Sequence, residues 1–229
     1  MSLNEFCIEK SIKERVPACR LGYLLLNDLH IQSESAALQS EFSLLRQAIS
    51  EQYTLDGLSQ VTRIAAVRSM YKKMSWDPSR YRPSAEALVR RILQKKELYQ
   101  INSAVDASNY CSIKFLLPFG LYDADKLHGS IRYQVATEGE YSNIGGKTAK
   151  TEGKPFLSDE NGVFGNPTSD AKRTAVTLLT KNVLSIVYAD EEITTRELSE
   201  ILSYTAEKIR FHNGGRLIKH GIVTACDDK

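Results

Sequence analysis

The stretch RPSAEALVRRIL, from Arg82 to Leu93, carries the clearest helical pattern in the sequence. Pro83 suits the first turn of a helix, where a missing N–H leaves no hydrogen bond unmade. Apolar residues then recur at helical spacing on one side, which we expect to be buried: Ala85, Leu88, Val89, Ile92 and Leu93. Basic residues occupy the other side and continue past it: Arg90, Arg91, Lys95 and Lys96. The stretch predicts an amphipathic helix with a basic outer face.

Upstream of this helix the pattern predicts one strand and two more helices. Partly alternating apolar residues from Ala18 to Ile31 favour a strand. A helix is also indicated by apolar residues that recur at helical spacing: Leu38, Phe42, Leu45 and Ile49. A second helical face begins near Leu58, and Asp77-Pro78 ends it because the residue before proline avoids the helical conformation.

Beyond Gly129 the sequence changes to short β-like stretches separated by glycine. We expect strands at Ser130–Ala136, Pro155–Leu157, Ala175–Leu179, Val183–Tyr188 and Arg216–Ala225. One helix interrupts them, because Thr194 and Glu197 form a capping box ahead of an apolar stripe. Gly214-Gly215 ends that helix.

These elements predict a single α+β domain over residues 1–229. Residues 1–80 supply an N-terminal strand and helices, which pack on a mixed β core supplied by the later part of the chain. Hydrophobic residues make up 42% and charged residues 25% of the chain, which is typical of a globular protein that buries a core.

Composition also bears on class and location. The longest apolar runs fall far short of the roughly 20 residues that span a bilayer, and no run near the start has signal-peptide length. The four cysteines lie singly, without metal-ligand spacing, so we expect buried, reduced thiols and no metal site: Cys7, Cys19, Cys111 and Cys226. We therefore expect a cytoplasmic protein without a membrane partner, metal or organic cofactor.

Charge is distributed unevenly along the chain. The segment 61–96 holds ten basic and two acidic residues, although the whole chain has a net charge of +2. Such a segment is typical of a face that binds a polyanion, because neutralised phosphates release their counterions. Solvated helix faces explain the same pattern.

The common catalytic signatures are absent: the sequence has no GxSxG, HExxH, P-loop or GxGxxG motif. Each of the four histidines stands alone, which is more typical of a structural role. The chemistry must be sought in other residues.

A series of ordered motifs does carry a resemblance. After the basic helix come INSAVDASNY (101–110), LPFGLYDADKL (117–127) and SDENGVFG (158–165). Together they resemble the third and fourth, editing, domain region of the phenylalanyl-tRNA synthetase beta subunit. The resemblance covers about the last two-thirds of the chain, residues 81–229, and implies a β-sandwich-like core there. The resemblance implies a free-standing domain that binds the acylated 3′ end of tRNA and hydrolyses a mischarged aminoacyl ester.

The resemblance also assigns the site. It implies that Ser108 and Asn109 are catalytic, and that a group of polar and glycine residues binds the substrate: Gly120, Tyr122, Gly165, Asn166, Thr168, Ser169 and Asp170. The basic residues Arg90, Arg91, Lys95 and Lys96 would dock RNA phosphates. Turns and caps would explain the same polar residues without any function.

Two departures from the synthetase pattern favour an alternative. Gly120 stands where the synthetase has a histidine, and Asn166 to Asp170 replace a segment in which a glutamate recognises the tyrosine hydroxyl. The alternative is a non-catalytic module of the same fold that binds RNA, an amino acid or a small metabolite. The chain also lacks the parts of a synthetase that activate an amino acid, so it is not a complete aminoacyl-tRNA ligase.

Overall fold

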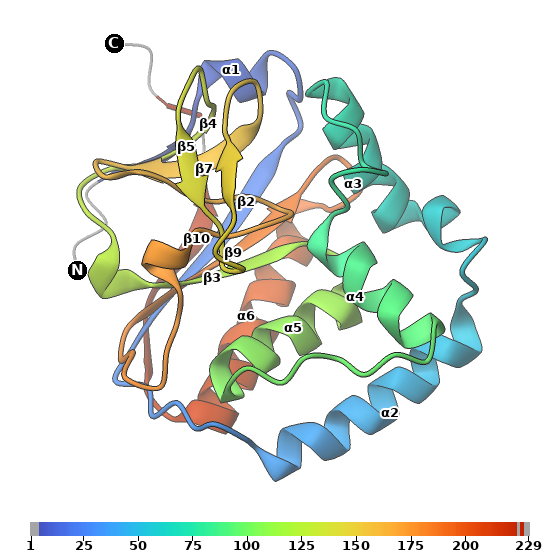
Figure 1. Ribbon diagram of the computed structural model, residues 1–229. Coiled ribbons are helices and arrows are strands. Elements are labelled where there is room, and N and C mark those ends of the chain that lie inside the picture. Colours follow the sequence, from blue (N-terminus) through green and yellow to red (C-terminus); the bar gives the residue numbers. More distant parts are fainter. Residues whose placement is uncertain (1–4, 224, 227–229) are drawn as a thin grey trace.

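Two four-stranded β-sheets organise the protein in the computed structural model, which describes residues 5–223 and 225–226 (Figure 1). The first sheet has the order β1-β4-β7-β8, with bounds Phe6–Ile8, Ile131–Val135, Pro155–Asp159 and Gly162–Gly165. The second has the order β10-β2-β9-β3, with bounds Arg216–Val223, Arg20–Asn27, Val183–Ala189 and Phe119–Asp123. Only β1 and β4 pair in parallel among these described strands. A separate hairpin joins β5 (Glu140–Ser142) to β6 (Thr148–Lys150).

Aromatic side chains join the two sheets. The rings of Tyr133 on β4 and Tyr188 on β9 lie 5.7 Å apart between centroids. Tyr122 on β3 meets Phe164 on β8 edge-on at 4.8 Å. All four are fully or almost fully buried, so the sheets pack face to face as a sandwich, as the sequence predicts.

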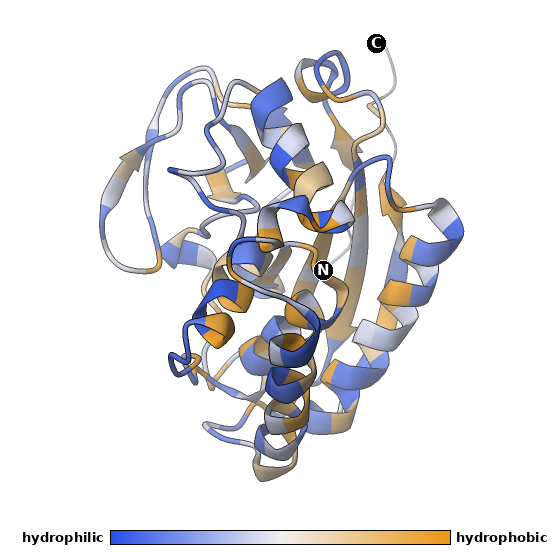
Figure 2. Cartoon of the chain, turned by 90° about the vertical axis from the view of Figure 1, so that its right-hand side faces the viewer, coloured by the Kyte–Doolittle hydropathy of each residue, from blue (hydrophilic) through white to orange (hydrophobic). Residues whose placement is uncertain are grey.

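Helices gather on the far side of the second sheet (Figure 1). The main helices are α2 (Ala36–Gln52), α3 (Thr62–Lys73), α4 (Ser84–Leu93), α5 (Ser103–Phe115) and α6 (Thr195–Asn213). A single turn, α1 (Lys10–Lys13), and three short 3-10 turns complete the fold: η1 (Leu58–Gln60), η2 (Ala124–Lys126) and η3 (Lys172–Thr174). α5 and α6 contact the second sheet directly, while α2 and α4 pack on α5. The strands between the helices are largely hydrophobic in Figure 2. The α+β fold expected from the sequence is confirmed.

Local signals explain where the helices begin. The Thr194 hydroxyl accepts a hydrogen bond from the Glu197 N–H at 3.1 Å, as the predicted capping box requires. Asn102 caps α5 in the same way through the N–H groups of Ala104 and Val105. The sequence patterns did not indicate α5 as a helix.

Two strand predictions need comment. The segment Ala175–Leu179 is a loop and not a strand; Leu179 is 87% exposed, so the apolar run there has no sheet to join. The predicted strand Arg216–Ala225 forms β10 as far as Val223, and Thr224 lies outside the described residues.

The cysteine prediction is wrong in part. Cys7 and Cys226 form a disulfide, whereas Cys19 and Cys111 are free and buried. Ile8 bridges Ala225 in parallel and its carbonyl accepts the Cys226 N–H, which brings residues 219 positions apart to a Cα separation of 4.8 Å. Because disulfides persist in oxidising compartments, the cytoplasmic location loses the support of reduced thiols.

Both sheets combine the first 80 residues with the rest of the chain. β1 pairs with β4, and β2 pairs with β9 and β10. No helix within the described residues is long and apolar enough to cross a membrane.

Candidate functional site

A pocket of about 150 Å³ opens beside β3, the edge strand of the second sheet. Ser108 and Asn109 of α5 line one side, and Asp170, from the segment after β8, lines another. The structure therefore brings three of the predicted site residues together from distant parts of the sequence. The remaining walls are apolar: Ile101, Val105, Phe119, Leu121, Ile144, Ala175 and Val176.

Helical spacing explains which residues of α5 line the pocket. Val105, Ser108 and Asn109 stand at i, i+3 and i+4 and so share one face of the helix. Ser108 is 4% exposed, while Asn109 is half-buried. The Asn102 cap fixes the start of this helix and with it the position of both polar side chains.

Strand alternation on β3 divides its residues between two faces. Phe119 and Leu121 line the pocket, whereas Gly120 and Tyr122 belong to the opposite face. A Cβ at Gly120 or at Gly165 would clash with the Tyr122 ring. The two predicted glycines thus make room for Tyr122, and neither lines the pocket.

Tyr122 connects this buried face to the pocket. Its hydroxyl donates a hydrogen bond to Asp170 Oδ1 at 2.8 Å and lies 3.3 Å from the Tyr188 hydroxyl. Burial raises the pKa of Tyr122 well above its ordinary value, and the neighbouring Asp170 charge raises it further. The phenol therefore stays protonated near neutrality and acts as a donor.

The same surroundings change the protonation of Asp170. Burial raises the pKa of its carboxyl to about 7, and the hydrogen bond from Tyr122 opposes that rise. A carboxyl with this pKa is divided between its charged and neutral forms near neutrality. It can accept a proton from a bound molecule at physiological pH.

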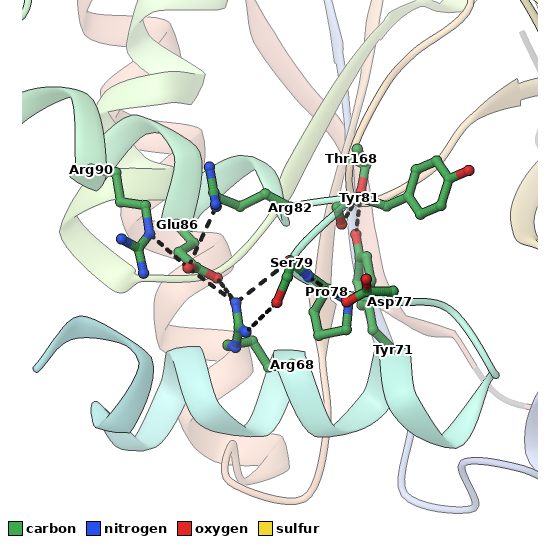
Figure 3. Close-up of polar contacts among 10 residues, drawn as sticks. All are labelled: Arg68, Tyr71, Asp77, Pro78, Ser79, Tyr81, Arg82, Glu86, Arg90 and Thr168. Carbon is green, nitrogen blue, oxygen red and sulfur yellow. Dashed lines mark hydrogen bonds and ion pairs between the residues drawn. The ribbon is translucent and has the colours of Figure 1, made fainter. Parts of the chain in front are cut away.

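The loop before Asp170 is held by local hydrogen bonds. Asn166 Oδ1 accepts the N–H groups of Thr168 and Ser169, each at 2.8 Å. The Thr168 hydroxyl bonds to Tyr71 at 2.6 Å and to the Tyr81 carbonyl at 3.2 Å (Figure 3). Asn166 and Thr168 therefore position the loop and do not line the pocket.

The predicted RNA-binding residues lie along α4 and its end, and they differ in surroundings. Arg90 donates to Glu86 Oε1 at 2.8 Å. Arg91 stacks on Tyr99, with 4.1 Å from its guanidinium carbon to the ring centre. Lys95 and Lys96 are exposed. The structure does not bring these four residues into the pocket.

Sequence reasoning missed the apolar walls of the pocket. Val105 stands one turn before Ser108 and Asn109 on α5, so recognising the Asn102 cap would have indicated it. No local signal links the exposed Ile144, near the β5–β6 hairpin, to Ile101. Among the described residues, no group of three or more His, Cys, Asp or Glu side chains is arranged to hold a metal ion.

Comparison with known proteins gives three findings. Residues 66–217 match the B3/4 domain family. "Uncharacterized protein YhzB" of Bacillus subtilis (strain 168) is 22% identical over 216 residues, which cover 94% of this chain and 98% of that protein. The crystal structure of an N-terminal fragment of the phenylalanyl-tRNA synthetase beta subunit from Pyrococcus horikoshii is 14% identical, with a TM-score of 0.48. That match covers 93% of this chain but only 50% of the synthetase chain.

Proposed function

The chain belongs to the B3/4 domain family, which is related to the phenylalanyl-tRNA synthetase beta subunit, and we propose that its pocket binds the aminoacyl end of tRNA and hydrolyses the ester bond of a mischarged amino acid. The convergence of Ser108, Asn109 and Asp170 in one apolar pocket is the observation that supports this proposal. Because its substrate would be tRNA, we also propose a cytoplasmic location.

Asp170 would serve as the general base. A water molecule attacks the ester carbonyl and transfers a proton to the carboxylate, which has a pKa suited to that task near neutrality. Collapse of the tetrahedral intermediate releases the amino acid, and the proton passes to the departing ribose oxygen. Each hydrolysis thereby regenerates the carboxylate.

Asn109 and Ser108 would act on the ester. The Asn109 amide has two N–H donors, which suit the oxyanion that forms on the carbonyl oxygen. The Ser108 hydroxyl would orient the substrate or the attacking water. Both side chains lie on one face of α5, whereas Asp170 comes from the segment after β8, so attack and charge stabilisation would come from different elements.

The size of the pocket limits what enters it. About 150 Å³ is below the usual 300–1,000 Å³ of ligand pockets, so it suits an amino-acid side chain and not a nucleoside. Ile101 and Ile144 are 55% and 58% exposed and line the pocket, and they offer apolar surface to the adenosine outside.

The same small volume favours a second candidate function. A non-catalytic module that binds a free amino acid or small metabolite needs only the enclosed part of the pocket. Under that reading Asp170 would bind an ammonium or hydroxyl group of the ligand and would transfer no proton.

Deacylation of a panel of mischarged tRNAs, beginning with tyrosyl-tRNA(Phe), tests the proposal. We expect hydrolysis that rises with pH to a plateau, with a midpoint near the pKa of Asp170, about 7. Asp170→Asn and Asn109→Ala should each reduce kcat/KM by about 100-fold or more. Glu200→Gln changes an exposed carboxylate on α6 and serves as the matched control.

The alternative has a different outcome. If folded wild-type protein hydrolyses none of the substrates but binds free amino acids in calorimetry, and Asp170→Asn abolishes that binding, the non-catalytic module is correct. Hydrolysis that survives both pocket variants would place the reaction elsewhere on the protein.

A further inference from the structure

We propose that Arg68, Arg82 and Arg90 form a binding site for a phosphate group, and that the RNA backbone near the acylated 3′ end of tRNA supplies that phosphate. The identity of the RNA rests on the function proposed above, but the site itself does not. The three arginines come from α3, from the segment before α4, and from α4, and they converge on one carboxylate, Glu86 (Figure 3).

The contacts to Glu86 are short and unequal. Arg68 Nη1 donates to both carboxylate oxygens, at 3.1 and 2.9 Å. Arg90 Nε donates to Oε1 at 2.8 Å, and Arg82 Nε lies 3.6 Å from the same oxygen. The Glu86 side chain is 0% exposed, so the carboxylate acts as an anchor behind the arginines and does not face water.

The cluster holds more positive than negative charge. Three guanidiniums around one carboxylate leave a formal charge of +2. Arg68 alone contacts both oxygens of Glu86, so neutralising this carboxylate does not require Arg82 and Arg90. Guanidiniums held this close repel one another unless a further anion joins them.

The remaining donors are available to such an anion. The side chains of Arg82 and Arg90 are 42% and 23% exposed. Within the described part of the chain, their terminal Nη groups have no hydrogen-bond partner. A phosphate offers several acceptor oxygens, and the planar guanidinium fork binds phosphate in a bidentate manner.

Neighbouring groups extend the positive surface. Two cations contact the Tyr81 ring: the Arg80 guanidinium carbon lies 5.2 Å and Lys154 Nζ lies 5.3 Å from its centre. Tyr81 directly precedes Arg82. An aromatic ring next to cationic groups is a combination that single-stranded nucleic acid uses, because bases stack while phosphates pair with the charges.

One loop connects the arginine cluster to the pocket. The Ser84 N–H, at the start of α4, donates to the Pro167 carbonyl at 2.9 Å, and Thr168 bonds to Tyr71 and Tyr81. Asp170 follows two residues after Thr168 and lines the pocket. An RNA whose aminoacyl group enters the pocket would keep its 3′ nucleotides outside it, and this loop leads from the pocket to the arginines.

The test removes the two arginines that Glu86 does not require. In Arg82→Gln/Arg90→Gln the Arg68–Glu86 pair remains, so we expect a folded protein. Its affinity for uncharged tRNA should fall about tenfold or more at low salt, and the dependence of log K on log salt should flatten by about 1 or more. The double variant Arg196→Gln/Arg216→Gln removes the same charge from exposed arginines and should bind nearly as wild type.

Binding of inorganic phosphate tests the site itself, independently of whether RNA supplies the phosphate. Followed by thermal unfolding, phosphate should stabilise the wild type and the control but not Arg82→Gln/Arg90→Gln. Glu86→Gln removes the competing negative charge, so it should bind phosphate severalfold more tightly than the wild type. Weaker or unchanged phosphate binding in Glu86→Gln, where that variant folds, contradicts the charge argument.

Two results would overturn the proposal. Equal binding of phosphate and tRNA by Arg82→Gln/Arg90→Gln and by its charge-matched control would show that the cluster is a structural ion network. Loss of phosphate binding with unchanged tRNA binding would overturn RNA as the source and assign the site to a small phosphorylated molecule. Neither measurement requires deacylation, so failure of the proposed hydrolysis leaves the test intact.

Discussion

Glu86 and Asp170 are both carboxylates enclosed by protein, but their surroundings are opposite. Three guanidiniums surround Glu86, whose side chain is fully buried. Asp170 accepts hydrogen bonds from the neutral Tyr122 phenol and from the backbone at Asn166, and no cation among the described residues is one of the causes that shift its pKa, which burial raises to about 7. The positive charge around Glu86 exceeds the charge of one carboxylate, so the cluster has the capacity to bind a further anion. Asp170 has no such cations beside it within the described part of the chain, so its carboxyl exchanges protons near neutrality. The comparison separates the region that we propose for docking, around Glu86, from the one that we propose for the reaction, around Asp170.

The largest expected effect comes from removing the anchor of the first region. Glu86→Ala leaves three guanidiniums without their carboxylate, and we expect a loss of about 3–5 kcal/mol in the free energy of unfolding. Urea denaturation measures this loss. Glu200→Ala breaks an exposed pair with Arg196 and should change stability by less than about 1 kcal/mol. Equal, small losses in both variants would mean that water already solvates the arginine cluster.

The next effect tests whether packing fixes the position of Tyr122, which donates a hydrogen bond to Asp170. Gly165→Ala places a methyl group against the Tyr122 ring, and we expect a loss of about 1–3 kcal/mol from overpacking. At Gly145 a Cβ would have an ordinary contact of 3.4 Å with Asn143, so Gly145→Ala is the control. If Gly165→Ala is as stable as this control, Tyr122 is free to move and the Asp170 hydrogen bond is not fixed by packing.

Sequence patterns predicted the elements of the docking region better than those of the pocket. α4 has one apolar and one charged face, so its period is visible in a single sequence. α5 buries small and polar residues on several sides, such as Ser103, Ala107 and Ser112, so no apolar stripe marks it. The local signal that marks the start of α5 is the Asn102 cap.

Local sequence patterns could not predict which residues distant in the sequence lie close together in the fold. The disulfide joins Cys7 to Cys226, and the pocket joins Ser108 to Asp170. The resemblance to the synthetase beta subunit indicated Ser108, Asn109 and Asp170, but the place of Glu86 at the centre of three arginines required the structure. Counting charges along residues 61–96 found the excess without showing where it converges.

A third prediction concerns the pH dependence of stability. The folded pKa of Asp170, about 7, exceeds its ordinary value of 3.8, so the unfolded chain releases this proton first as pH rises. Between about pH 4 and 7 the wild type therefore loses stability that it had in acid, and it does not recover above pH 7. Asp170→Asn avoids that loss. We therefore expect the free energy of unfolding of Asp170→Asn, relative to that of the wild type, to increase by up to about 4 kcal/mol between pH 4 and pH 8.

Urea denaturation at pH 4 and pH 8 measures whether the wild type loses stability relative to Asp170→Asn as the pH rises. A difference between Asp170→Asn and the wild type that is the same at both pH values would show that Asp170 ionises in the folded state without cost. The pocket would then be well hydrated, and the contrast with Glu86 would disappear. Glu200→Gln again provides a carboxylate-to-amide control at an exposed position.

The smallest expected effect isolates the side-chain hydrogen bond from Tyr122 to Asp170. Tyr122→Phe removes the hydrogen bond that opposes the rise in the pKa of Asp170, so this pKa should increase by about half a unit. The midpoint of the pH–rate profile, or of the carboxyl carbon shift in NMR, should move upward with it. Tyr188→Phe removes a hydroxyl that contacts Tyr122 and should move the midpoint less. Equal displacement by both variants would mean that the two phenols and the carboxyl act as one network, in which case the donor of Asp170 is the pair and not Tyr122 alone.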